Sequence, residues 1–298
     1  VMSAAPAIPL TSPPRLSRVL RSRWSIVGGL GLALLLGAMT MFTSLIHCRR
    51  LVAHVQHLGG TALVEPWAPE WLDDSLKLSP YWPFQSVVAI DLLKSRSVPR
   101  SDVEELFRQL NRQTTLGELR IHRMDIRDED LAFIPHNKSL VLLHLSHTSL
   151  TGAGLVHIAH HPQLISVNLS HNSIGDRGVT HLATCPRLSY LDLSHTSATD
   201  EGVRHLSGCS ALFDVALNST HVSDEGLASL SRIKLLLRLE LNHTEITSAG
   251  LKHLKACRHL KKLDASNTGI TEDAAGAAAG DDVVAGAAVD NVGAAGDG

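Results

Sequence analysis

The chain has few aromatic residues, few cysteines and little net charge. Phe, Trp and Tyr make up only 4% of its 298 residues, and four cysteines are too few for the disulfide framework of a small secreted domain. The formal net charge of −2 does not supply the basic surface that non-specific nucleic-acid binding requires, so we expect no nucleic-acid partner. The hydrophobic content of 44% excludes a wholly disordered chain.

The motifs that mark common catalytic sites are also missing from the sequence. It contains no Gly-rich phosphate loop, no HExxH zinc helix and no GxSxG nucleophile elbow. Its Asp and His residues recur at regular intervals instead of gathering in one segment. We therefore predict that the protein is not an enzyme and carries no cofactor.

An uncharged apolar run lies near the N-terminus. As a helix, residues 24–46 would span about 30 Å, the thickness of a bilayer's hydrocarbon core, so we predict one transmembrane helix here after an Arg-rich head, residues 1–23. A cleaved signal peptide is the alternative, although its apolar region usually has about 7–15 residues. Four arginines precede the run and two follow it, Arg49 and Arg50. This bias favours a cytoplasmic head and an extracytoplasmic remainder.

The next segment, residues 47–86, differs in composition from everything after it. Leu51, Val55 and Leu58 predict a short amphipathic helix that ends at Gly59. Trp67 and the aromatic residues that follow it predict an N-terminal cap over the exposed end of a repeat stack, the alternative being a ligand pocket. For Cys48, acylation and a free thiol both remain open.

Leucines then recur every 24 residues, at positions 116, 140, 164, 188, 212, 236 and 260. The unit LxxLxLSHTxhTDxGLxHLxxCx, where h is apolar, predicts a short strand whose fourth and sixth residues face the core, followed by a turn and a helix. An earlier, irregular unit begins with a strand over Val87–Leu92 and a helix opened by a capping box at Ser101–Glu104. We predict an α/β, right-handed solenoid of about eight rungs over residues 87–273, with a parallel sheet on its concave face and short helices on its convex face.

Polar and small residues at fixed positions of the unit mark its turns. The ninth position is Thr or Asn, whose side chain can satisfy turning backbone, and Thr151, Thr199, Ser223 and Thr247 stand where helix N-caps are needed. Asp200 and Asp224 follow in the first turn, where the helix dipole favours anions. A glycine before each apolar helix face indicates close approach of neighbouring units. Residues 274–298 contain only Ala, Gly, Asp, Val and Asn, and we predict a disordered tail.

The unit resembles leucine-rich repeats, in the TDxGL form of bacterial single-pass, membrane-anchored repeat proteins. The order of parts over about residues 15–273 matches that group: a basic head, a span, Leu58-Gly59-Gly60, a Trp-rich stretch and then repeats. This resemblance implies protein interaction rather than chemistry. The unit is also similar to the cysteine-containing leucine-rich repeats of ubiquitin-ligase substrate receptors, but no adaptor-binding helical box precedes the repeats here.

Histidines and cysteines occupy fixed columns of the repeat. His147, His171 and His195 fall just past the strand in adjacent units, about 5 Å apart, a spacing that would let two imidazoles share Zn²⁺. No carboxylate or thiolate completes a ligand set, so we predict no metal site. Stacking would instead lower the proton affinity of these imidazoles by mutual repulsion. We expect the column of Cys185, Cys209 and Cys257 to be buried and unbridged.

The concave sheet face is the predicted binding surface, because its side chains vary while the frame repeats. The candidate binding residues are Tyr190, Asp192, Asp214, Arg238, Glu240, His147, His171 and His195. An aromatic residue with acidic neighbours suits a basic protein partner, and a plain solvated face is the equal alternative. The sequence therefore predicts a membrane-anchored scaffold for protein–protein interaction. The alternatives are a structural envelope protein without a discrete ligand and a ubiquitin-ligase-type substrate receptor.

Overall fold

The computed structural model describes residues 39, 43, 45–66, 85–93, 98–271 and 284–285. The chain divides into two compact units, Val1–His47 and Cys48–Gly298. In the first unit the described residues are helical. The predicted basic head, most of the predicted span and the Trp-rich stretch lie outside the described residues. Within the described ranges, no helix is both long and apolar enough to cross a membrane.

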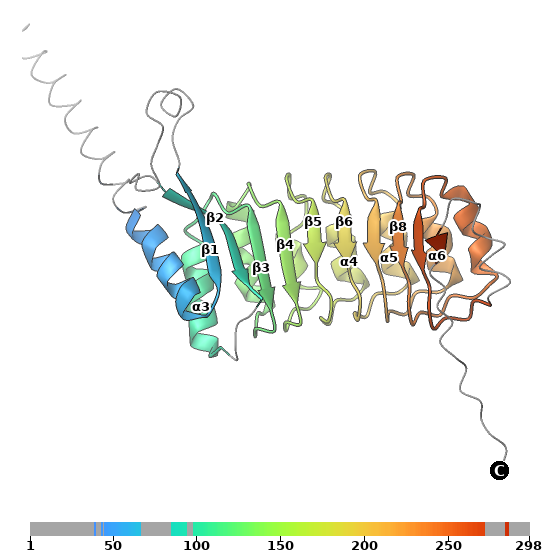
Figure 1. Cartoon of the computed structure of the whole chain (residues 1–298), viewed down its shortest axis with the longest axis horizontal. Coiled ribbons are helices and arrows are strands. Elements are labelled where there is room, and N and C mark those ends of the chain that lie inside the picture. The colour runs from blue at the N-terminus through green and yellow to red at the C-terminus, as the bar shows by residue number, and fades with distance from the viewer. Residues whose placement is uncertain are drawn as a thin grey trace, which may run out of the picture. The chain divides into compact units, whose positions relative to one another are not determined.

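The second unit is built on one ten-stranded sheet whose strands follow chain order (Figure 1). Strand β1 pairs antiparallel with β2, and every later strand pairs in parallel with the one before it. The strands are β1 (Thr61–Pro66), β2 (Gln85–Leu92), β3 (Glu118–His122), β4 (Leu142–Ser146), β5 (Ser166–Asn168), β6 (Tyr190–Asp192), β7 (Asp214–Ala216), β8 (Arg238–Glu240), β9 (Lys262–Asp264) and β10 (Val284–Ala285). From β3 to β9 each residue pairs with the residue 24 positions later, so the sequence repeat is also the structural repeat.

Short helices connect the strands and lie behind the sheet in the view of Figure 1. They are α3 (Arg100–Leu110), η1 (Asp128–His136), η2 (Gly154–His157), α4 (Asp176–Leu182), α5 (Asp200–Leu206), α6 (Asp224–Leu230) and η3 (Gly250–Ala256), where η marks a 3-10 helix. Units with Asp in the first turn of the repeat helix form α-helices in α4, α5 and α6. In the units of η2 and η3 this position holds Gly152 and Ser248, but η1 has Asp128 at the same position and is also a 3-10 helix, so the aspartate alone does not set the helix type.

The hydrophobic core lies between the strands and the helices. Leu143, Leu145 and their equivalents are fully buried except in the last unit, where Leu263 is nearly buried and Ala265 partly buried. Helix residues such as Val203 and Leu206 are also fully buried, which confirms the predicted inward positions. Asn172 supports the turn after β5, because its Nδ2 donates to Leu145 O at 2.7 Å and to Leu169 O at 2.9 Å. The repeated turns therefore have their buried carbonyl groups satisfied.

The N-terminal end of this core is covered by residues 48–57, which are helical, and by β1. Leu51 and Val55 are fully buried and Leu58 nearly so, which confirms the amphipathic helix. Cys48 is also buried in the core, so its thiol is not presented to solvent.

Two local predictions differ from the structure. Helix α3 begins at Arg100 after an N-cap at Pro99, with no side-chain cap, so Ser101 lies inside the helix and does not open a capping box. The fixed φ of proline explains the earlier start. In the predicted tail, Val284–Ala285 pair in parallel with Lys262 and Leu263 of β9 instead of lacking secondary structure; its other residues lie outside the described ranges.

Candidate functional site

Aspartates at the N-termini of η1, α4, α5 and α6 join these rungs to the next ones and so help to hold the sheet face in register. The Asp176 carboxylate accepts hydrogen bonds from Thr199 N and Thr199 Oγ1, both at 2.8 Å, and Asp200 accepts equivalent bonds from Ser223 at 2.8 and 2.6 Å. Asp128 and Asp224 form the same contacts with the following units. The sequence analysis assigned Asp200 and Asp224 only to the helix dipole and missed these bonds between rungs.

The predicted N-caps are confirmed at two of four positions. Thr199 and Ser223 accept hydrogen bonds from the second helical N–H, both at 3.3 Å. Thr151 and Thr247 are not the N-caps of η2 and η3, which are capped by Ala153 and Ala249. These two helices begin two residues later in the unit than α5 and α6, although Thr151 Oγ1 and Thr247 Oγ1 still accept a hydrogen bond from the N–H two residues on, at 3.3 and 3.2 Å.

Five of the candidate binding residues meet on adjacent strands β6, β7 and β8. Tyr190, Asp214 and Arg238 pair across the sheet, and Asp192 and Glu240 stand two residues later on β6 and β8. Arg238 Nη1 contacts Asp214 Oδ2 at 3.1 Å, and Lys262 Nζ contacts Glu240 Oε1 at 3.4 Å. Two of the three carboxylates are thus already paired, which reduces the attraction for a basic partner that the sequence suggested.

Burial governs the ionisation of this group. It raises the pKa of Tyr190 to about 12, with further increases from the carboxylates of Asp192 and Asp214. Burial also raises the pKa of Asp214, against the opposing effect of Arg238. The Tyr190 hydroxyl is therefore neutral at physiological pH and can both donate and accept a hydrogen bond.

The structure adds two apolar side chains that the sequence analysis missed. Phe213 and Leu237 directly precede β7 and β8 and are 40% and 36% exposed. They are neighbours, since Leu237 N donates to Phe213 O at 2.8 Å. The sequence could have revealed them, because the second position of the unit is polar in the flanking rungs, at Ser189 and Lys261, and apolar in these two rungs. We call Tyr190, Asp192, Phe213, Asp214, Leu237, Arg238 and Glu240 the β6–β8 patch.

The three candidate histidines form a continuous stack at the other end of the strands. Ring centroids of His147 and His171 are 3.7 Å apart and those of His171 and His195 are 4.0 Å apart, with interplanar angles of 13°. His122, which sequence reasoning missed because it stands at another position of its unit, meets His147 edge-on at 4.7 Å. Face-to-face rings direct their nitrogen lone pairs along parallel planes and not toward one shared ion. In the described part of the chain, no three His, Cys, Asp or Glu residues are placed to hold a metal.

Three imidazoles of the stack are harder to protonate than free imidazoles. The pKa values of His122, His147 and His171 are lowered, chiefly by burial and secondarily by neighbouring positive charge, including other imidazoles of the stack. The direction agrees with the sequence-based expectation, but repulsion between the rings is the smaller cause.

The cysteine column is structural. Cys185, Cys209 and Cys257 are buried and free, which confirms the prediction. Cys185 Sγ donates to Ile158 O of the preceding rung at 3.3 Å. Burial raises the pKa of Cys209 to about 11, so this thiol is unreactive at neutral pH.

Comparison with known proteins agrees with the repeat. A family model described as a leucine-rich repeat matches residues 160–183, which is one 24-residue unit. Together with the rung geometry above, this match supports a leucine-rich-repeat protein with an α/β solenoid fold. No curated protein sequence is similar enough to the chain to count as a match.

Among solved structures, two internalins from Listeria monocytogenes are similar to the chain. The internalin inlF has a TM-score of 0.48 and 16% identity, with 62% of this chain and 56% of that chain covered. The internalin C2, inlC2, has a TM-score of 0.40 and 18% identity, with 59% of this chain and 77% of that chain covered. The present chain thus spans little more than half of inlF.

Proposed function

We propose that the protein is a membrane-anchored scaffold whose leucine-rich repeats bind a protein partner through the β6–β8 patch. The observation that carries this proposal is the exposure of Phe213 and Leu237 on adjacent rungs, where they directly precede Asp214 and Arg238, the two residues of an ion pair. Protein interfaces combine such aromatic and apolar anchors with a polar rim.

The rigidity of the patch supports recognition. Its residues lie on or directly before strands that are hydrogen-bonded on both sides, so little backbone entropy is lost when a partner binds. The Arg238 guanidinium is held at 3.1 Å from Asp214, which orients it before binding. Exposed apolar side chains on a rigid face are otherwise unfavourable in water, and clusters of them mark interaction sites.

The anchoring part of the proposal rests on sequence. The uncharged run of residues 24–46 is long enough for one span, and the arginine bias favours an extracytoplasmic repeat unit. A fusion of alkaline phosphatase after residue 271 tests this topology, because the enzyme is active only outside the cytoplasm. We expect phosphatase activity from this fusion and no fluorescence from a matched fusion, at the same residue, to a reporter that folds only in the cytoplasm. The reverse result would contradict the proposed topology.

Crosslinked affinity capture from native membranes tests the binding site. A Phe213→Ser/Leu237→Ser double variant removes both anchors at exposed positions, so the fold is retained. Val156→Ser is the matched control, because Val156 is 52% exposed but lies on η2, away from the strands. We expect a protein captured by the wild type and by the control and lost by the double variant. Equal capture by all three, or by none, would contradict the proposal.

A further inference from the structure

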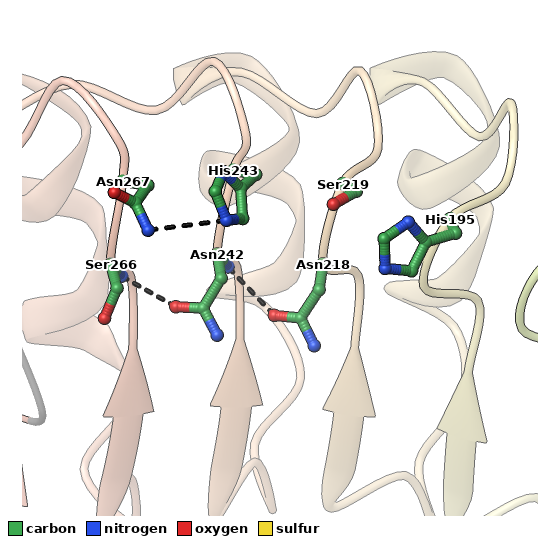
Figure 2. A pocket seen from close by; sticks show the side chains of 7 residues that line it. All are labelled: His195, Asn218, Ser219, Asn242, His243, Ser266 and Asn267. Atoms are coloured by element: carbon green, nitrogen blue, oxygen red, sulfur yellow. Dashed lines mark hydrogen bonds between the residues drawn. The ribbon is translucent and has the colours of Figure 1, made fainter.

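A shallow hollow of about 550 Å³, open to solvent, lies at the carboxyl ends of the strands, beyond the β6–β8 patch (Figure 2). It extends over four consecutive units, from His195 to Asn267. Its volume is in the range of about 300–1,000 Å³ that is usual for small-molecule sites. Neither the fold nor the proposed protein binding requires it.

The hollow exists because the histidine column is interrupted. His195 and His243 occupy the eighth position of their units at φ angles of +56° and +55°, and Ser219 occupies the same position between them at +53°. The backbone is therefore the same in the three rungs, and only the imidazole ring is missing. Figure 2 shows the small Ser219 side chain between the two rings, with the His195 ring turned toward it.

A row of side-chain amides forms one wall of the hollow. Asn218 Oδ1 accepts a hydrogen bond from Asn242 N at 2.9 Å, and Asn242 Oδ1 accepts one from Ser266 N at 2.7 Å. Each amide oxygen is thus fixed along the row. Asn218 Nδ2 donates to Ser194 Oγ and Glu240 Oε2, both at 3.2 Å, whereas the amide nitrogen of Asn242 points away from the row (Figure 2). For Asn242 Nδ2, no acceptor is found among the described residues, so the row presents an oriented donor to a ligand.

The imidazoles add donors and flat surfaces. Asn267 Nδ2 lies 3.4 Å from the ring nitrogen Nε2 of His243. The face of His195 that is not stacked on His171 remains open to a ligand, because rings contact His195 on one side only within the described residues.

The lining restricts the class of ligand. Its lining consists of amide, hydroxyl and imidazole side chains, with no aliphatic side chain and no Lys or Arg. The hollow offers no apolar pocket for a hydrophobic protein side chain. It also offers no Lys or Arg to an anionic ligand, which would instead be repelled by Glu240, whose carboxylate lies 3.2 Å from Asn218 Nδ2. From this we infer that the hollow binds a neutral carbohydrate, whose hydroxyl groups match the amides and hydroxyls and whose C–H faces pack on the imidazole rings.

The Ser219→His variant tests this inference directly. It restores the column residue at a φ angle that histidine already adopts in the flanking units, so it fills the hollow without backbone strain. His147→Ser is the matched control, since it changes the same column away from the hollow. The probe is an array of neutral oligosaccharides of glucose, galactose, mannose and N-acetylglucosamine, with sialylated oligosaccharides on the same array, and the full chain is used throughout.

We expect the wild type and His147→Ser to bind the same neutral oligosaccharide, and Ser219→His to bind it at least about tenfold more weakly, measured by calorimetry. A second variant, Asn242→Asp, keeps the acceptor for Ser266 N but removes the outward donor, and we expect the same loss. The inference is overturned if no neutral oligosaccharide binds, if only sialylated ones bind, or if both variants bind like the wild type. These outcomes are independent of the capture of a protein partner by the β6–β8 patch.

Discussion

Individual carboxylates decide how firmly one rung is attached to the next. Asp200 accepts two hydrogen bonds from Ser223, one of them from a backbone N–H that has no other acceptor in the described structure. Where the chain has Gly152 in place of this aspartate, the partner position also loses its side chain, at Gly175. At these two boundaries, the aspartate and the hydroxyl side chain that it contacts in the next rung are therefore either both present or both absent.

Replacing Asp200 with Ala should reduce the free energy of unfolding by about 1–3 kcal/mol, because it leaves the Ser223 N–H and hydroxyl without their acceptor. Glu225→Ala is the control: Glu225 also lies in the first turn of a helix, α6, but is exposed. We expect a loss below about 0.5 kcal/mol there. Urea denaturation measures both, and equal losses would assign the effect to the helix dipole alone.

The histidine stack should make stability depend on pH. Folding lowers the pKa values of His122, His147 and His171 from the usual 6.5, so below that pH the unfolded chain binds more protons than the folded chain. The stabilisation is complete above pH 6.5 and is lost as the pH falls toward the lowered values. We expect the free energy of unfolding to decrease between pH 7 and pH 5.

The variant His171→Asn should make this decrease smaller, because it removes the central ring of the stack. Asn already occupies the equivalent position at Asn267, with φ at +56°, so the backbone tolerates the change. His136→Asn is the control, since His136 is exposed and lies outside the stack. An unchanged pH dependence in His171→Asn would show that the stack does not carry it.

At the scale of elements, close packing of helix N-termini sets the spacing between rungs. A methyl group at Gly226 of α6 would meet Asp200 Oδ1 of the preceding rung and would lie 2.6 Å from Val222 Cγ1. The glycine column therefore serves the close approach that the sequence predicted, and the approaching group is the same aspartate that joins the rungs.

Gly226→Ala should lower the free energy of unfolding by about 1–3 kcal/mol, the usual cost of overpacking a tight contact. Gly208→Ala is the matched control, because the nearest atom to its added methyl is His205 O at 3.7 Å. We expect no loss there. Thermal unfolding followed by circular dichroism compares the two variants. If Gly226→Ala did not lower the free energy of unfolding, the rungs would be able to move apart to accept the methyl group, which would contradict the close packing.

The strands were predictable from the sequence, whereas the helix types were not. Alternating leucines such as Leu143 and Leu145 specify inward positions whatever their partners are. The repeat pattern does not distinguish η1, a 3-10 helix that begins at Asp128, from α4, an α-helix that begins at Asp176, and the start of α3 depends on Pro99. A pattern read from the repeat consensus overlooks such exceptions.

For the molecule as a whole, the sequence predicted the parallel solenoid and placed five candidate residues on one face of it. It did not predict the ion pairing or the burial of these residues. The repeat spacing places Asp214 and Arg238 on adjacent rungs, but their ion pair and the burial of Tyr190 depend on side-chain conformations that the spacing does not determine. Phe213 and Leu237 were missed because leucine-rich sequences direct attention to buried positions. The hollow at Ser219 was missed because it results from a side chain that is absent.

Site-specific photocrosslinking in the native host tests the central claim most directly. A photoreactive phenylalanine analogue replaces Phe213 in the β6–β8 patch or, as the control, Val156 on η2; both positions are exposed, at 40% and 52%. The account predicts one discrete crosslinked protein from position 213 and none from position 156. The same products from both positions, or no product from position 213, would contradict recognition of a partner by this patch.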